Sequence, residues 1–171
     1  TDVTMPMKDR MIIRSKGVLR EKGESGNLPS GEVYLAPWED QTNGKLVIDG
    51  SMAGIGMIET PIVIDIVNGY AESITGGKEA QLLVEILDKS GREARAVAEF
   101  GIGTNYKAKL TGLILEDEKV FGTIHIAFGN NLTMGGRIAV SSHLDGLVTK
   151  PDVYFDDVLI MQKGKPIGFD L

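Results

Sequence analysis

The chain has 171 residues, of which 42% are hydrophobic and 25% are charged, and this composition suits one globular domain with a real core. The net charge of −6 argues against a nucleic-acid partner, which needs a basic face, and no apolar run is long enough to span a bilayer. Because cysteine is absent, disulfides and thiolate metal sites are excluded, and we expect a cytoplasmic protein.

The first half of the chain predicts a series of short strands. Its apolar runs are separated by glycine-containing turns, which is typical of a β-rich fold. Asn43-Gly44 and Asn68-Gly69 are hairpin-turn signals. The predicted strands cover residues 11–13, 33–35, 45–49, 62–67 and 70–74.

The second half begins with the clearest helix, predicted over residues 78–89, where apolar residues recur at three- and four-residue spacing and Gly91 follows the end. After it we predict strands at 95–100 and 122–128, a short helix at 113–119, extended segments at 138–140, 153–155 and 158–162, and a last hairpin through Gly164. The whole chain, 1–171, is therefore predicted to be a single α+β domain, mainly an antiparallel sheet or barrel with one or two helices.

The chain has two histidines, His125 and His143. His143 lies two residues before Asp145, so on a strand the imidazole and the carboxylate would share one face. His125 lies among β-branched residues that favour a buried strand, where an imidazole needs a polar partner, and a metal ion is one candidate. The alternative for either histidine is an ordinary packed or surface residue.

Two of the 24 acidic residues stand out by their position. Glu32 opens an apolar strand, and Glu99 has apolar neighbours on both sides, so each would be costly to bury without a cation or a raised pKa. The alternative is that either side chain points outward from an exposed strand face. The acidic run 116–118 is interpreted as a solvated helix face, with Lys119 as a partner.

These candidates offer carboxylate oxygen and imidazole nitrogen, which suit zinc, cobalt, manganese or ferrous iron. Three carboxylates and two imidazoles are more ligands than one open catalytic zinc needs. They suit a pair of ions bridged by one carboxylate, which can share a hydroxide and polarise a carbonyl group.

At these residues the sequence resembles the aminopeptidase T and aminopeptidase S metallopeptidases. The similar blocks are residues 27–33 with Ala36-Pro37 behind them, residues 98–105, residues 117–129, and Gly135-Gly136 followed by Ser142-His143-Leu144-Asp145. They occur in the order of the family and cover most of positions 27–148.

The resemblance implies a dinuclear zinc or cobalt site, with manganese or iron as alternatives, whose ligands are Glu32, Glu99, His125, His143 and Asp145. Glu99 would lie nearest the bridging water, as a bridge or as a general base. The implied reaction is removal of the N-terminal residue from a peptide or aminoacyl substrate by a homodimer. Residues 1–4 resemble the entry into the C-terminal half of the family, so we expect the chain to be the C-terminal part of a longer two-domain protein.

One departure concerns a tyrosine that the family peptidases carry seven residues after the first histidine. Leu132 occupies that position and has no donor. Asn130, Asn131 or Arg137 could supply one in its place.

Two other functions remain open. The same fold family includes a ring-cleaving dioxygenase that acts on dihydroxypyridine with one ferrous ion, and His125, His143 and Asp145 would satisfy its two-histidine, one-carboxylate site. In that case Glu32 and Glu99 would support the ligands or be unused. The third possibility is a metal-binding or assembly fragment without catalytic activity.

Overall fold

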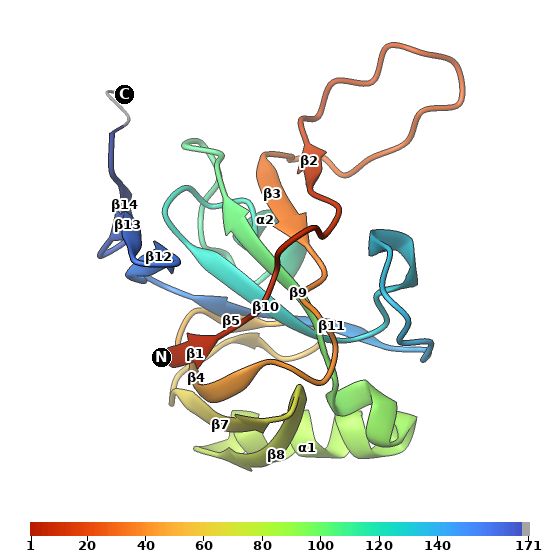
Figure 1. The fold of residues 1–171 in the computed structure, drawn as a ribbon, viewed down its shortest axis with the longest axis vertical. Coiled ribbons are helices and arrows are strands. Elements are labelled where there is room, and N and C mark those ends of the chain that lie inside the picture. Colours follow the sequence, from red (N-terminus) through yellow and green to blue (C-terminus); the bar gives the residue numbers. More distant parts are fainter. Residues whose placement is uncertain (169–171) are drawn as a thin grey trace.

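Two antiparallel sheets form the body of the molecule, and the computed structural model describes residues 1–168 (Figure 1). One sheet has the order β1-β4-β7-β8, with strands Asp2–Thr4, Asn43–Ile48, Ile62–Val67 and Tyr70–Thr75. The other has the order β2-β3-β9-β10-β11-β5-β6, with strands Ile13–Ser15, Glu32–Leu35, Val97–Gly103, Ile124–Gly129, His143–Val148, Ser51–Met52 and Gly56–Met57. A third sheet near the C-terminus consists of β12 (Val153–Phe155), β13 (Val158–Gln162) and β14 (Lys165–Pro166).

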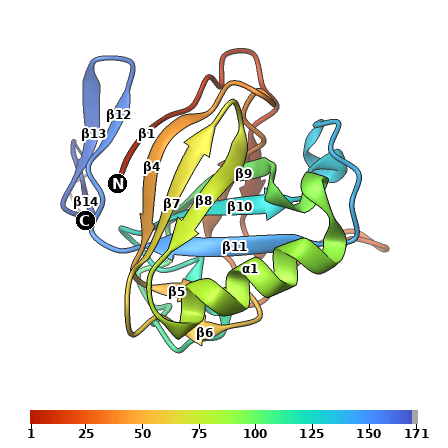
Figure 2. The ribbon, with the colours of Figure 1, turned by 90° about the horizontal axis from the view of Figure 1, so that it is seen from below.

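The main helix, α1 (Lys78–Ser90), packs beside β7 and β8 (Figure 2). It buries Ala80, Leu83 and Leu87 along one face, as their spacing predicts, and Gly91 follows its last turn at a φ of 83°. The other helical segments are single turns: α2 (Ile114–Asp117) and the 3₁₀ turns η1 (Arg92–Arg95) and η2 (Leu132–Met134). None of the helices in residues 1–168 has the length and apolar character needed to cross a membrane.

The hydrophobic core lies between the two large sheets, whose strands cross one another in Figure 2. β4 and β7 contribute alternate apolar residues from one side, and β10 contributes Ile124, Ile126 and Phe128 from the other. Gly146 on β11 allows the sheets to approach, because a Cβ there would lie 2.3 Å from Cδ1 of Ile48. Since successive side chains on a strand alternate, the other face of the second sheet is free to carry polar groups.

The structure confirms the predicted fold class, and it also confirms the turn at Asn68-Gly69 and the last hairpin through Gly164. The prediction for Asn43-Gly44 was wrong, because both residues lie inside β4, where both pair with β1 and Gly44 also pairs with β7. The observed bounds of other strands also differ from the predicted ones. β2 begins only at Ile13, η1 precedes β9 where a strand was predicted from 95, and residues 138–140 form no strand.

Candidate metal centre

The predicted ligands all come from one face of the second sheet, the face turned away from the core. They lie on four adjacent strands, at Glu32 on β3, Glu99 on β9, His125 on β10, and His143 and Asp145 on β11. Along β9, β10 and β11 these side chains alternate with core residues, so the period of two that builds the core also gathers the polar groups. The structure therefore brings together all five residues predicted from the sequence.

Small residues between these ligands make room for them. Ala127 on β10 pairs with Glu99 on one side and Asp145 on the other, so the two carboxylates flank a methyl group. Gly101 pairs with His125, and a Cβ built on Gly101 would lie 2.0 Å from the ring nitrogen Nε2. The imidazole thus occupies the space that a side chain at position 101 would fill, and in this place its Nε2 faces the carboxylates.

Glu99 lies at the centre of the group and is buried. Its Oε1 lies 3.2 Å from Nε2 of His125, and its Oε2 lies 3.1 Å from Nε2 of His143. Burial by itself would raise the pKa of Glu99, but the hydrogen bonds and charges of the two histidines lower it to about 2. Glu99 is therefore a carboxylate anion that links the two imidazoles.

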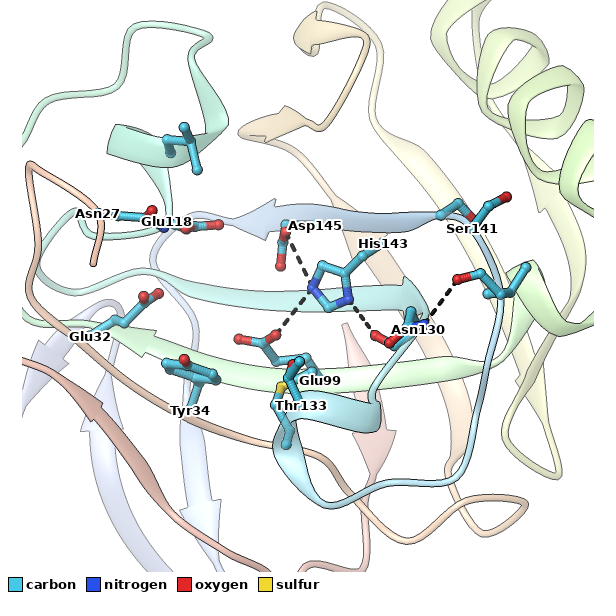
Figure 3. Close-up of a pocket in the computed structure, with 14 residues that line it drawn as sticks. Asn27, Glu32, Tyr34, Glu99, Glu118, Asn130, Thr133, Ser141, His143 and Asp145 are labelled. Carbon is cyan, nitrogen blue, oxygen red and sulfur yellow. Dashed lines mark hydrogen bonds and ion pairs between the residues drawn. The ribbon is translucent and has the colours of Figure 1, made fainter. Parts of the chain in front are cut away.

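His143 is held by the chain on the side of the ring away from Glu99. Its Nδ1 donates a hydrogen bond of 2.7 Å to the backbone oxygen of Asn130, and its Nε2 also lies 3.6 Å from Oδ2 of Asp145 (Figure 3). Burial opposes the charged ring, but Asp145, Glu99 and the Asn130 carbonyl raise its pKa to about 11. A carbonyl that orients one ring nitrogen and leaves the other for an ion is a common arrangement around metal-binding histidines.

His125 is completely buried, and its Nε2 also lies 3.5 Å from Oε2 of Glu32. Burial lowers the pKa of this ring, but the hydrogen bond to Glu99 and the charges of Asp145, Glu99 and Glu118 together raise it to about 9. For the carboxyl group of Glu32, the effect of burial is the stronger one, so its pKa is raised although the nearby His125 and Lys119 lower it. Buried carboxylates of this kind require cationic partners, which the two histidines and Lys119 supply here and which a metal ion would supply in their place.

The interpretation of residues 116–118 as a solvated helix face was wrong for Asp117 and Glu118, whereas the predicted pairing with Lys119 is confirmed. Asp117 and Lys119 are fully buried and Glu118 nearly so. Lys119 extends its Nζ to Oε1 of Glu32 at 3.0 Å and also pairs with Glu118, while Asp117 accepts hydrogen bonds from the backbone of Thr111 and Gly112. Burial and the nearby Asp145 raise the pKa of Glu118 to about 7. Strand alternation could not reveal these residues, because they lie at the end of α2 and in the turn that follows it.

The residues considered as replacements for the family tyrosine have other partners. The Asn131 side chain donates to Oε1 of Glu39 at 3.1 Å, and the guanidinium group of Arg137 pairs with Asp40. The Asn130 side chain donates to the backbone of Val140. Leu132 is about half exposed, at 51%.

A cavity of about 420 Å³ opens onto the centre. Glu32, Glu99, Glu118, His143 and Asp145 line it. The other lining residues are Asn27, Tyr34, Leu115, Asn130, Thr133, Met134, Val140, Ser141 and Ser142 (Figure 3). Tyr34 was not among the residues predicted from the sequence, although its position two residues after Glu32 on a predicted strand places both on one face.

The donor set fits a divalent metal ion. Two groups of three ligand atoms each lie within 4.8 Å of one another, namely Glu32-Glu99-His125 and Glu99-His143-Asp145, and Glu99 belongs to both. In the part of the chain that the structure describes, the set His125-His143-Asp145 is not among the groups that meet this distance. Nitrogen and carboxylate oxygen suit iron, zinc, cobalt and manganese alike, so the donors by themselves select neither the metal nor the number of ions.

Comparison with known proteins identifies the family to which the chain is similar. A family model described as 2,5-dihydroxypyridine 5,6-dioxygenase (NicX) matches residues 1–168. The 2,5-dihydroxypyridine 5,6-dioxygenase of Pseudomonas putida is 26% identical over 186 aligned positions, which cover 98% of this chain and 52% of that protein. The family match thus favours the dioxygenase alternative over the aminopeptidase that was predicted first.

Two solved structures share the fold. The structure of 2,5-dihydroxypyridine dioxygenase from Pseudomonas putida KT2440 matches 85% of this chain and 46% of that chain, with a TM-score of 0.78 and 23% identity. AmpT from Thermus thermophilus matches 92% of this chain and 45% of that chain, with a TM-score of 0.71 and 23% identity. The chain spans about half the length of the relatives it matches.

Proposed function

The chain belongs to the 2,5-dihydroxypyridine 5,6-dioxygenase (NicX) family, and from this premise we propose that it carries the iron site of an enzyme that opens the ring of a hydroxylated pyridine with molecular oxygen. One ferrous ion would be held by His125, His143 and Asp145, with Glu99 beside both imidazoles. The observation that carries the proposal is the family match over residues 1–168, together with the meeting of both histidines at one buried carboxylate.

The protein supplies the orientation of the ligands. Asn130 holds Nδ1 of His143, Gly101 leaves room for the ring of His125, and Glu99 pairs with Nε2 of both rings. Binding one ion at these three residues would require the His125 ring to join the group that His143 and Asp145 already form with Glu99. When bound, the iron supplies the oxygen chemistry that no side chain can provide.

The cavity suits a small planar substrate. Its volume of about 420 Å³ lies at the lower end of the range of small-molecule sites, and Tyr34, Leu115 and Met134 add apolar surface to its polar lining. Glu118 lines the same cavity, and because its pKa is raised to about 7, it can accept a proton from a ring hydroxyl near neutral pH.

We keep a two-metal aminopeptidase as the second candidate because of one specific observation. The two ligand groups share Glu99, and a bridging carboxylate of this kind is what a pair of ions requires. The fold similarity to AmpT is compatible with this candidate.

Elemental analysis and activity of the purified chain together test the proposal. We expect about one iron per chain after reconstitution under argon, and uptake of one O₂ for each 2,5-dihydroxypyridine consumed. About two zinc or cobalt ions and release of amino acids from aminoacyl substrates would refute it in favour of the second candidate. Metal binding without either reaction would favour a non-catalytic fragment. His143→Ala is the matched control and should bind iron much more weakly while the fold persists.

A further inference from the structure

Tyr34 lies on the same face of the sheet as the candidate metal ligands. It follows Glu32 by two residues on β3, so both side chains lie on the same face of the sheet. It pairs with Gly101, the residue over which the His125 ring lies. Because Gly101 has no side chain, the phenol ring and the imidazole both border the space above it. Figure 3 shows Tyr34 between Glu32 and Glu99.

The Tyr34 hydroxyl is available to a ligand. The residue is half-buried and lines the cavity. A tyrosine hydroxyl is protonated at neutral pH and can donate one hydrogen bond. The hydroxyl is therefore a protonated donor, in contrast to that of Tyr70, which is directed to Glu93 at 3.3 Å.

The rest of the cavity creates a need for such a donor. The carboxyl groups of Glu32, Glu99, Glu118 and Asp145 line the cavity, so an oxygen atom that gains negative charge when a substrate hydroxyl loses its proton needs a donor among the other lining side chains. The side chains of Asn130, Asn131 and Arg137, which follow His125 in the chain, are already bonded to other protein groups. A phenol can approach such an oxygen without adding another charge.

We propose that Tyr34 is a catalytic residue whose hydroxyl donates a hydrogen bond to a ring oxygen of the bound substrate. This inference rests on the proposed function, because it takes a hydroxylated pyridine as the ligand. It does not depend on the number of protein ligands around the ion. No covalent bond forms or breaks at Tyr34.

The test compares Tyr34→Phe with the parent chain, both loaded with ferrous iron and kept under argon so that no turnover occurs. The probe is 2,5-dihydroxypyridine, and its dissociation constant is measured by calorimetry. Losing one hydrogen bond should raise this constant about 2- to 12-fold. Iron content and the midpoint of thermal unfolding should stay the same. The matched control is Tyr154→Phe, since Tyr154 is exposed on β12 and does not line the cavity.

The outcomes separate this inference from the proposed function. If the parent chain binds the probe and Tyr34→Phe binds it equally well, the role of Tyr34 is refuted and the proposed function stands. If affinity falls only together with iron content or thermal stability, Tyr34 is structural and the inference is again refuted. If the iron-loaded parent chain does not bind the probe at all, the proposed function fails and the inference fails with it.

Discussion

Gly101 offers the most direct test of how the chain positions a metal ligand. A Cβ at this position would lie 2.0 Å from Nε2 of His125 and 2.2 Å from Cε1, whereas ordinary contact begins at 3.4 Å. In Gly101→Ala the ring therefore has to move by roughly 1.4 Å, the difference between these two distances for Nε2. Since a ligand nitrogen lies only about 2.1 Å from its ion, a shift of this size removes His125 from the coordination sphere.

We expect two measurable effects of Gly101→Ala. Metal affinity, measured by calorimetric titration, should fall at least about 10- to 100-fold, the range seen when the support of a ligand is disturbed. The free energy of unfolding of the chelator-treated chain should fall by about 1–3 kcal/mol, because the added methyl group overpacks a buried position. The two measurements are independent, and both can be compared with the same control variant.

Gly26→Ala is the matched control, because the nearest atom to its Cβ would be Cδ2 of Leu19 at 3.5 Å, in ordinary contact. It should change neither quantity. The reasoning would be refuted if Gly101→Ala bound metal as tightly as the parent chain. In that case the His125 ring could move without cost, and its place above Gly101 would not matter for the site.

Three further predictions follow from the site. If the parent chain binds one iron, Glu99→Gln should still bind about one ion per chain, with metal affinity lowered about 10- to 100-fold. If the parent chain binds two metals, elemental analysis of Glu99→Gln should show the loss of an ion. Asn131→Ala should lower the free energy of unfolding in urea by about 1–3 kcal/mol, because the fully buried amide bonds to Glu39 and to the backbone of Ile138. An unchanged midpoint of urea unfolding would show that these two hydrogen bonds do not stabilise the chain. Metal affinity should rise between pH 6 and pH 8, by up to about tenfold per pH unit for each proton displaced. The metal has to displace protons from both rings, because the pKa of His125 is raised to about 9 and that of His143 to about 11. A metal affinity that does not change with pH would contradict these values.

The same pKa shifts give the chelator-treated chain a defined pH range of stability. The two histidines, with pKa values above the ordinary 6.5, contribute stability that is fully present below pH 6.5 and is lost as the pH rises through 9 and 11. Glu99, lowered from 4.5 to about 2, contributes stability that is present above pH 4.5 and is lost as the pH falls toward 2. Urea unfolding at a series of pH values measures both limits.

Local pattern was a good guide wherever one face of an element faces the core. The spacing of apolar residues located α1, and the alternation along 62–67 located β7, because burial of one face imposes the period of the element. The pattern was a poor guide at Asn43-Gly44, because pairing with two neighbouring strands overrides a turn preference. It also missed the buried Lys119, whose environment comes from β3 and from a neighbouring turn.

The sequence by itself determined which ligand types the candidate metal centre can offer. With no cysteine and two histidines, only imidazole and carboxylate ligands were available, and the local neighbours of Glu32, Glu99, His143 and Asp145 already singled them out. Only the tertiary structure decided that these side chains converge, that Glu99 lies between the two imidazoles, and that Tyr34 and Glu118 share their cavity. The physical reason is that strand register and sheet order set the distances between residues far apart in the chain, and local sequence carries no direct measure of either.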